Sequence, residues 1–421
     1  MVIECLYNET CFVGVTKILT FATMNDIAIV GGGIVGLSTA YQILKGKPKT
    51  KLILLEKESD VGQHQTGHNS GVIHSGIYYK PGSLKAKNCI DGYKMLLKFA
   101  KENGIAMDLC GKLIVASNEK EKEQIQMLFN RGQENGLEGL KILNSSEIKE
   151  VEPFVEGTQA IYVPQTGIID YRIVCQKLKE KIEKLGGKVI TNFEVQNLFE
   201  DKNNVVIQSR KRKEIQVKMA INCGGLQSDR LARKSVQHLD TKIVPFRGEY
   251  FKLKETSKYL VKNLVYPVPD PNFPFLGVHF TRMINGDVEA GPNAVLAFKR
   301  EGYKKTDFNL SDFLETLIWP GFQKVAIKYW KTGLGELYRS YSKGAFTKAL
   351  QKLIPSIQKS DLISAPAGVR AQASSRDGGL LDDFKIEEEG QLIHVLNAPS
   401  PAATSSLSIG KTVADLALPK L

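Results

Sequence analysis

The sequence predicts an α/β fold whose first unit is a Rossmann-like nucleotide-binding domain, and three neighbouring patterns indicate it. Residues 27–30 form a short apolar run that stops at glycines, which is typical of a buried parallel strand. Residues 37–44 then place apolar side chains on one face at helical spacing. Residues 51–56 form a second apolar strand. Strand, helix and strand in this order make a compact βαβ unit.

Further along the chain, the patterns predict elements of both kinds. A loop rich in His, Gly, Asn and Ser spans 62–83. Apolar spacing predicts helices at 84–103, 120–136 and 171–185, and strands at 112–116, 188–190 and 219–221. Strands separated by Pro-rich turns follow between 242 and 300, then helices at 309–355, short strands near 380–396 and a last helix from Thr404.

Nucleotide-binding signals appear at both ends of the chain and in its middle, so we predict a discontinuous cofactor domain with a second domain inserted into it. The cofactor domain would comprise residues 24–95, 160–241 and 361–421, and the inserted substrate domain, with a mixed sheet and a helical cap, residues 96–159 and 242–360. Residues 1–23 carry Glu4 and Glu9 where a signal peptide needs positive charge. We interpret them as an extension outside the fold, with a targeting or anchoring role as the alternative.

Composition excludes several classes of protein. The chain has 421 residues, of which 42% are hydrophobic and 24% charged, and these fractions exclude a disordered, collagen-like or coiled-coil chain. The six cysteines are scattered and form no Cys-x-x-Cys pair. Their spacing argues against a disulfide framework or a zinc site and fits a reducing, cytoplasmic compartment.

The charge balance bears on partners. The net charge is +12, from 57 Lys and Arg against 45 Asp and Glu, and it attracts acidic metabolites, membrane surfaces or nucleic acid without choosing among them. Because the sequence has no recognisable nucleic-acid-binding module, we expect no nucleic-acid partner. Residues 27–44 are uncharged and approach the minimum length of a membrane span. Glycines interrupt them, so a buried strand and helix explain them better.

The strongest local motif is Gly31-x-Gly33-x-x-Gly36, which follows a strand and opens a helix. Glycines at these positions allow a tight turn and bring backbone N–H groups close to a pyrophosphate at the helix N-terminus. Glu56 ends the next strand, 20 residues beyond Gly36, where it can accept hydrogen bonds from a ribose. The motif therefore predicts dinucleotide binding, and a Gly-rich turn that only packs helix against strand is the alternative.

The loop from His64 to Tyr79 is the most unusual stretch. Its small residues let the backbone reach a flat ligand, and its hydroxyls, amides and three histidines supply hydrogen bonds and titratable groups. A zinc site at His64, His68 and His74 is disfavoured, since Thr66-Gly67 breaks the helical display of the first two and no carboxylate or thiolate is nearby. Histidines that only cap a loop are the alternative.

Longer motifs point to a family. They are the loop His64-Gln-Thr-Gly-His-Asn-Ser-Gly-Val-Ile-His-Ser-Gly-Ile-Tyr-Tyr79, Pro164-Gln-Thr-Gly-Ile-Ile-Asp-Tyr-Arg172, Val244-Pro-Phe-Arg-Gly-Glu249, Tyr266-Pro-Val-Pro-Asp-Pro271, Phe275-Leu-Gly-Val-His-Phe280, Gly291-Pro-Asn-Ala-Val-Leu-Ala-Phe-Lys-Arg-Glu-Gly-Tyr303, Pro366-Ala-Gly-Val-Arg-Ala-Gln372 and Asn397-Ala-Pro-Ser-Pro-Ala-Ala-Thr-Ser405. From about Asp26 to Leu418 the chain resembles the L-2-hydroxyglutarate dehydrogenase/oxidase family of the D-amino-acid-oxidase-like FAD superfamily.

The resemblance implies FAD, held by a two-domain fold with the flavin at the interface. In this chain, the ADP half would be held by Gly31, Gly33, Gly36 and Glu56, with Lys57 beside it. The remaining cofactor contacts would come from Thr66, Asn69, Ser70 and Gly71 at the ribityl and flavin, Val195 at the adenine, Gly224 and Gly225 at the pyrophosphate, and Ala402, Ala403 and Thr404 at the N-terminus of the last helix, which faces the flavin O2 edge.

The resemblance also implies the reaction, which is oxidation of L-2-hydroxyglutarate to 2-oxoglutarate by hydride transfer from C2 to the flavin. A histidine suits the base that takes the hydroxyl proton. We favour His279, with His74 as its rival or as an orienting group near the flavin; a satisfied core histidine is the alternative for His279. Other FAD enzymes of this fold, acting on another 2-hydroxy acid, an amino acid or glycerol 3-phosphate, remain an alternative, as does a non-catalytic flavoprotein.

Basic and amide side chains are the candidates for the substrate's two carboxylates. Arg370 is the first choice, because a guanidinium grips a carboxylate bidentately, and a structural salt bridge is its alternative. For the second carboxylate, Asn293, Lys299 and Arg282 are candidates. Arg247 is interpreted as a brace for the flavin loop.

Residues 320–360 bear on the electron acceptor, which is oxygen or a membrane quinone. Eight Lys and Arg stand there against the single acid Glu336, among aromatic side chains. Such a stretch fits a peripheral contact with the anionic inner face of a membrane. An ordinary solvated helical cap is the alternative, and the sequence favours it.

Overall fold

The computed structural model describes residues 24–270 and 276–421, so the predicted extension 1–23 lies outside the described residues. Two eight-stranded sheets form the body of the molecule, and two three-stranded sheets accompany them. The predicted α/β fold with a Rossmann-like domain and an inserted mixed-sheet domain is confirmed.

The first large sheet contains the predicted βαβ unit. Its parallel strands are β1 (Asn25–Val30), β2 (Leu52–Leu55), β9 (Lys188–Ile190), β12 (Glu214–Asn222) and β22 (Leu392–Asn397). Antiparallel additions are β10 (Val195–Asp201), β11 (Asn204–Ser209) and β21 (Lys385–Glu389). The order is β10-β11-β12-β1-β2-β9, with β22 paired to β12 and β21. Strands from both ends and the middle of the chain therefore share one sheet.

Four helices pack together beside this sheet, and they are α1 (Ile34–Gly46), α2 (Leu84–Glu102), α5 (Tyr171–Lys184) and α10 (Ser406–Ala417). α1 contacts α5 and α10, and α10 also contacts α2. The apolar positions predicted on one face of α1, including Leu37 and Leu44, belong to the same buried cluster as Ile27 and Leu54 of the strands. At Gly410, a Cβ would lie 2.5 Å from the carbonyl carbon of Ser38, so the glycine allows α10 to pack closely on α1.

The second large sheet belongs mainly to the inserted domain. Its order is β19 (Leu362–Ser364), β14 (Phe251–Leu253), β17 (Val288–Gly291), β16 (His279–Arg282), β15 (Leu264–Pro267), β5 (Lys112–Ala116), β7 (Gln159–Val163) and β6 (Lys141–Asn144). β5 and β15 pair in parallel, and their other neighbours pair antiparallel. Helices α3 (Lys122–Glu134), α4 (Ser145–Val151) and α9 (Lys343–Leu350) bury apolar side chains against it.

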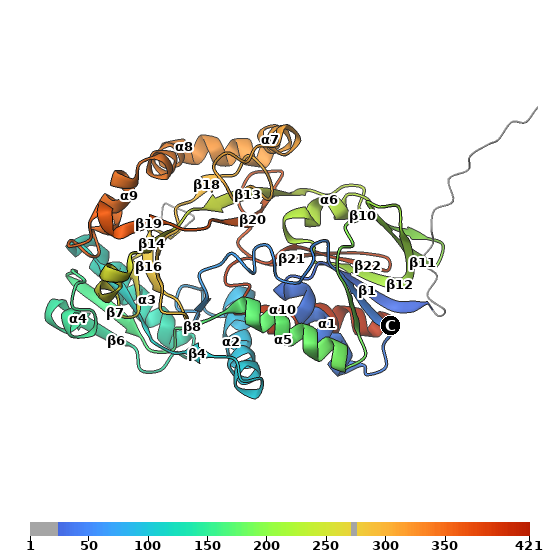
Figure 1. Ribbon diagram of the computed structural model, residues 1–421, viewed down its shortest axis with the longest axis horizontal. Helices are drawn as coiled ribbons and strands as arrows, with labels where there is room; N and C mark the ends of the chain where they lie inside the picture. Colours follow the sequence, from blue (N-terminus) through green and yellow to red (C-terminus); the bar gives the residue numbers. More distant parts are fainter. Residues whose placement is uncertain (1–23, 271–275) are drawn as a thin grey trace, which may run out of the picture.

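The two smaller sheets and the remaining helices complete the fold. The small sheets are β18 (Val295–Leu296), β13 (Thr241–Gly248) and β20 (Gly368–Ser375), and β3 (Val72–Ile73), β8 (Gly167–Ile169) and β4 (Met107–Asp108). The other helices are α6 (Ser228–Ala232), α7 (Leu310–Leu317) and α8 (Pro320–Tyr341), with 3-10 turns at Glu119–Glu121, Gly225–Gln227, Glu255–Leu260, Lys359–Asp361 and Leu418–Lys420. Figure 1 shows the two large sheets at opposite ends of the long axis and α7, α8 and α9 along one outer edge.

Most predicted elements lie where the patterns place them, with a few differences at boundaries. β19 falls in the predicted cofactor segment 361–421 and β7 almost wholly in 160–241, yet both belong to the second sheet. The helix predicted at 120–136 begins with a 3-10 turn and becomes α-helical only at Lys122. Residues 27–44 form β1 and α1 as expected. Among the described residues, no helix combines the length and the apolar character that a membrane span requires.

Candidate active site

A cavity of about 1100 Å³ opens at the carboxyl ends of β1 and β2. Its walls come from all three segments of the predicted cofactor domain and from the inserted segment 242–360, so distant parts of the chain meet around it. Open α/β sheets bind ligands in this position, and the volume suits a large cofactor together with a small substrate.

The glycine motif forms the turn between β1 and α1. Gly31 has a φ of +109°, and a Cβ there would lie 2.5 Å from the carbonyl oxygen of Cys223. A Cβ on Gly36 would lie 2.0 Å from the carbonyl oxygen of Gly31, so this glycine packs the helix onto the turn. Gly33 is the N-cap of α1 and lines the cavity with Gly31. The backbone therefore offers a glycine-lined helix N-terminus to the cavity, which suits a pyrophosphate.

Glu56 and Lys57 directly follow β2, and both line the cavity. Glu56 is buried, and its Oε2 accepts a hydrogen bond from Gly32 N at 2.6 Å while its Oε1 accepts one from Glu58 N at 2.9 Å. A carboxylate has about four lone-pair sites, so capacity remains for ribose hydroxyls. Lys57 is ion-paired with Glu301.

The His-rich loop forms the next wall. Thr66, Asn69 and Ser70 line the cavity, and Thr66 Oγ1 accepts a hydrogen bond from Ile34 N at 3.1 Å. Asn69 orders the loop, because its Oδ1 accepts a hydrogen bond from Gly71 N at 2.7 Å. Gly71 is not part of the lining; it has a φ of +67° and packs against the Ile169 carbonyl, where a Cβ would come within 2.8 Å.

Two further walls carry the other predicted cofactor residues. Val195, Gly224 and Gly225 line the cavity on one side, and Ala402, Ala403 and Thr404 line it directly before α10. Thr404 is buried, and its hydroxyl bonds to Tyr171 at 2.9 Å and accepts from His74 N at 3.1 Å. This network fixes the N-terminus of α10 at the cavity, where a helix dipole favours negative charge.

The two candidate bases, His74 and His279, come from distant parts of the chain. His74 lines the cavity after β3. His279, which opens β16 and is 4% exposed, is not among the residues that line it. The His279 ring stacks on Tyr266 at a centroid distance of 3.8 Å, and its Nδ1 bonds to the carbonyl of Gly277 at 2.8 Å.

Burial, together with the nearby charges of Arg370 and Lys112, lowers the pKa of each of these histidines to about 3. His279 also contributes to the lowered pKa of His74. At neutral pH both rings are therefore neutral, so that either can accept a proton.

The predicted carboxylate-binding residues separate into two groups. Arg370, on β20, and Lys299 line the cavity. Asn293 lies outside the lining, where it accepts from Glu249 N at 2.8 Å and donates to the Glu249 carboxylate at 3.1 Å. Arg282 also lies outside the lining, where it forms an ion pair with Asp108 of β4. Arg247 bonds to Glu249 at 2.9 Å.

Sequence reasoning missed Lys112, which opens β5. Its side chain is only 1% exposed, and its ammonium lies over the rings of Tyr78 and Tyr266, 4.4 and 5.0 Å from their centroids. Burial lowers the pKa of Lys112 to about 7. The only signal was a lysine at the head of an apolar strand, a pattern that solvent-exposed strand ends share.

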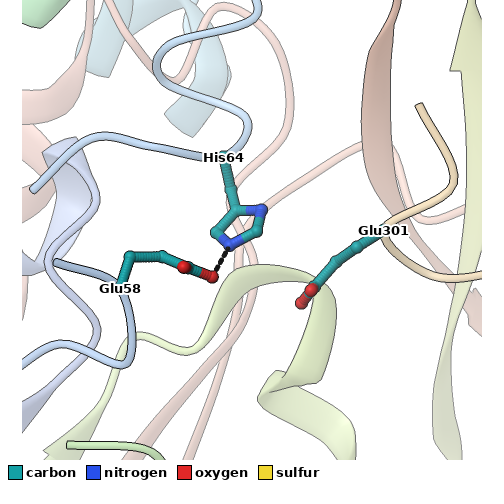
Figure 2. Close-up of side chains that lie close together, drawn as sticks. All are labelled: Glu58, His64 and Glu301. Carbon is teal, nitrogen blue, oxygen red and sulfur yellow. Dashed lines mark hydrogen bonds and ion pairs between the residues drawn. The ribbon is translucent and has the colours of Figure 1, made fainter. Parts of the chain in front are cut away.

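A cluster of Glu58, His64 and Glu301 has the residue types of a metal site, and Figure 2 shows the three side chains pointing toward one another. His64 Nε2 bonds to Glu58 Oε1 at 2.8 Å. Lys57 Nζ lies 3.6 Å from Glu58 and also pairs with Glu301. Because this ammonium already pairs with both carboxylates, we interpret the cluster as an ion-pair network at the cavity.

Comparison with known proteins identifies the family. The family model for DAO, described as FAD dependent oxidoreductase, matches residues 26–416. The chain belongs to this family. FAD is therefore its cofactor, as the family resemblance implied, and the chain is a flavin-dependent oxidoreductase. The residues present fit this cofactor, since the glycine turn, Glu56 and the α10 N-terminus converge on a cavity large enough to hold it.

Its relatives are similar over nearly their whole length. The chain is 58% identical to L-2-hydroxyglutarate dehydrogenase of Indibacter alkaliphilus over 394 residues, which covers 93% of this chain and 98% of that one. It is 48% identical to the protein of the same name from Escherichia coli strain K12, with 92% of each chain covered. The mitochondrial protein of that name from Homo sapiens is 47% identical, with 93% of this chain and 88% of that one covered.

Solved structures share the fold. L-α-glycerophosphate oxidase from Mycoplasma pneumoniae, with FAD bound, gives a TM-score of 0.76 at 24% identity, covering 93% of this chain and 94% of that one. Glycine oxidase from Geobacillus kaustophilus gives 0.70 at 17% identity, covering 94% and 95%. At these identities the likeness establishes the architecture alone.

The glycine turn gives a direct test of the cofactor cradle. In Gly36→Ala, the new Cβ would overlap the Gly31 carbonyl oxygen, so we expect the turn to be displaced and bound flavin to be largely lost, with overpacking of about 1–3 kcal/mol. Flavin content per protein and the thermal midpoint measure this. Gly333→Ala, on α8 with open space around the Cβ, is the matched control. Full flavin occupancy in Gly36→Ala would contradict the assignment.

Proposed function

We propose that this chain oxidises L-2-hydroxyglutarate to 2-oxoglutarate. The observation that carries the proposal is that His74 and Arg370 line the FAD cavity, in a chain 47–58% identical to proteins named for this activity. An alcohol beside a carboxylate needs both groups, because one accepts the hydroxyl proton and the other holds the acid.

The oxidation removes a proton from the C2 hydroxyl and a hydride from C2. Bound FAD supplies the acceptor of the hydride. His279 is our candidate for the base. Since the Gly277 carbonyl can only accept a hydrogen bond, Nδ1 of His279 carries the proton and Nε2 keeps a free lone pair. The stack on Tyr266 and this hydrogen bond hold the ring in one orientation, so Nε2 is the atom that would take the hydroxyl proton.

The low pKa of His279 applies to the site before substrate binds. Carboxylates placed near an imidazole favour its protonated form and raise its pKa, so a bound hydroxy acid would make His279 a stronger base. His74 remains the rival, because it lines the cavity and its backbone is held by Thr404. Its position beside the α10 N-terminus also suits an orienting role.

Arg370 is our candidate for the carboxylate next to C2. It stands on β20, lines the cavity and lowers the pKa of both histidines, so its charge lies close to the groups that would share the substrate. A guanidinium binds a carboxylate through two parallel hydrogen bonds and so fixes the position of C2. Asn293 and Arg282 have less support, because each faces a carboxylate of the chain itself.

The electron acceptor is oxygen or a quinone, and one surface favours a membrane. More than half of the exposed large hydrophobic side chains among the described residues lie within 308–341, on and around α7 and α8. Ile327 is 75% exposed and Trp330 56% exposed, and the exposed Lys328 and Lys331 flank them. This surface, which we define as the exposed apolar and basic side chains of 308–341, forms part of the outer edge in Figure 1. We infer that it contacts the anionic inner face of a membrane.

The substrate is tested by anaerobic mixing of the holoenzyme with each enantiomer of 2-hydroxyglutarate. We expect L-2-hydroxyglutarate to bleach the oxidised flavin absorbance and the D form to leave it unchanged. Glycerol 3-phosphate and an L-amino acid are the controls for related chemistries. If only one of these controls bleached the flavin, that compound would be the substrate in place of L-2-hydroxyglutarate. If no compound reduced the flavin, the chain would be a non-catalytic flavoprotein.

The base is tested by two matched substitutions. We expect His279→Ala to slow anaerobic flavin reduction by roughly 10²–10⁴-fold, because the hydroxyl proton loses its acceptor. His74→Ala should have a smaller effect on the same stopped-flow rate. If His279→Ala keeps the rate while His74→Ala loses it, the roles are reversed.

The membrane contact is tested by sedimentation with vesicles of anionic or neutral lipid. We expect binding to anionic vesicles that weakens as ionic strength rises, and a marked loss of binding in Ile327→Ser with Trp330→Ser, because the contact combines charge with apolar burial. Ile363→Ser, at an exposed apolar residue of β19, is the control. Equal sedimentation of all three proteins would refute this surface.

A further inference from the structure

Lys112 has a buried amine with no carboxylate partner among the described residues. Its side chain is 1% exposed, and its contacts are the faces of Tyr78 and Tyr266. In the part of the chain that the structure describes, no carboxylate lies within ion-pair distance of its ammonium. Buried ammonium groups are costly unless they are paired, and aromatic faces compensate only in part. An anion bound beside this ammonium would therefore stabilise its charged form.

The position of Lys112 connects this charge to the reacting groups. The ring of Tyr266 lies under the Lys112 ammonium and also stacks on His279, so one side chain touches both. Lys112 and Arg370 each act on both histidines. Two cations, one from β5 and one from β20, thus share the neighbourhood of the imidazole pair.

We propose that Lys112 binds the second carboxylate of a dicarboxylate substrate, while Arg370 binds the carboxylate next to the hydroxyl. This inference rests on the proposed function, since it assigns the C5 carboxylate of 2-hydroxyglutarate. The other candidates have competing partners: Asn293 bonds to Glu249, and Arg282 pairs with the β4 carboxylate. Lys299 lies two residues from Glu301, the carboxylate that pairs with Lys57. Lys112 would then select dicarboxylates over 2-hydroxy acids that carry one carboxylate.

The ionisation of Lys112 gives the site a pH dependence. Its pKa is about 7 because of burial, and the titratable or charged groups around it are Cys89, His74, His279, Arg370, Tyr78 and Tyr266. A neutral amine does not hold a carboxylate by charge. Affinity for a dicarboxylate should therefore fall as the pH rises through about 7, whereas affinity for a monocarboxylate held by Arg370 should not.

The test compares binding of glutarate and valerate, which differ by one carboxylate, to the flavin-loaded protein through the visible flavin spectrum. We expect Lys112→Met to weaken glutarate binding on the order of 100-fold and to leave valerate binding nearly unchanged. Lys85→Met is the matched control, because the Lys85 ammonium also lies over a tyrosine ring but is ion-paired with Asp382. It should bind glutarate like the unmodified protein.

Each outcome decides. Equal weakening of both ligands by Lys112→Met, or no weakening, would overturn the proposal. If this variant does not retain flavin, the unmodified protein decides: glutarate affinity that stays constant between pH 6 and pH 9, as an approximate range around the pKa of about 7, would overturn it. If glutarate binds through Lys112 but L-2-hydroxyglutarate does not reduce the flavin, the proposed substrate fails while the carboxylate site stands.

Discussion

The close approach of Gly31 to the Cys223 carbonyl is the contact on which the cofactor half of the molecule depends. It brings the ends of β1 and β12 together, although these strands are separated by most of the first half of the chain. Glu56 adds β2, because its carboxylate accepts the Gly32 N–H at 2.6 Å. Three parallel strands are thereby tied at their carboxyl ends, and the cavity opens where they meet.

A second constraint explains why the cofactor domain is discontinuous. The hydroxyl of Thr404, from the last segment, bonds to Tyr171 in the middle segment and to the backbone of His74 in the first. Gln65 similarly accepts the backbone N–H of Ala371 at 2.9 Å. The His-rich loop is thus held by β20 and by the residues before α10, so the wall beside the histidines forms only when the whole chain has folded.

The sequence predicted what local patterns determine and missed what depends on distant partners. The periodicity of apolar residues and the positions of glycines were sufficient to predict β1, α1 and β5, since the pattern of each lies within its own segment. Asn293 and Arg282 were chosen for side chains that bind carboxylates, and both do bind carboxylates, but those of the chain itself. Lys112 could not be found, because the register of β5 beside β15, which places Tyr266 next to it, is set by residues far apart in sequence.

The same charges that bind the proposed substrate also set the strength of the proposed base. Burial holds the pKa of His279 low, and the charges of Arg370 and Lys112 lower it as well. In the described part of the chain no carboxylate pairs with the Lys112 ammonium to offset its charge. A dicarboxylate brings one negative charge to each cation and removes that repulsion, so the imidazole becomes more basic when the correct substrate is bound. A monocarboxylate would leave the Lys112 charge uncompensated beside the ring. Selection of the substrate and activation of the base therefore follow from one electrostatic arrangement.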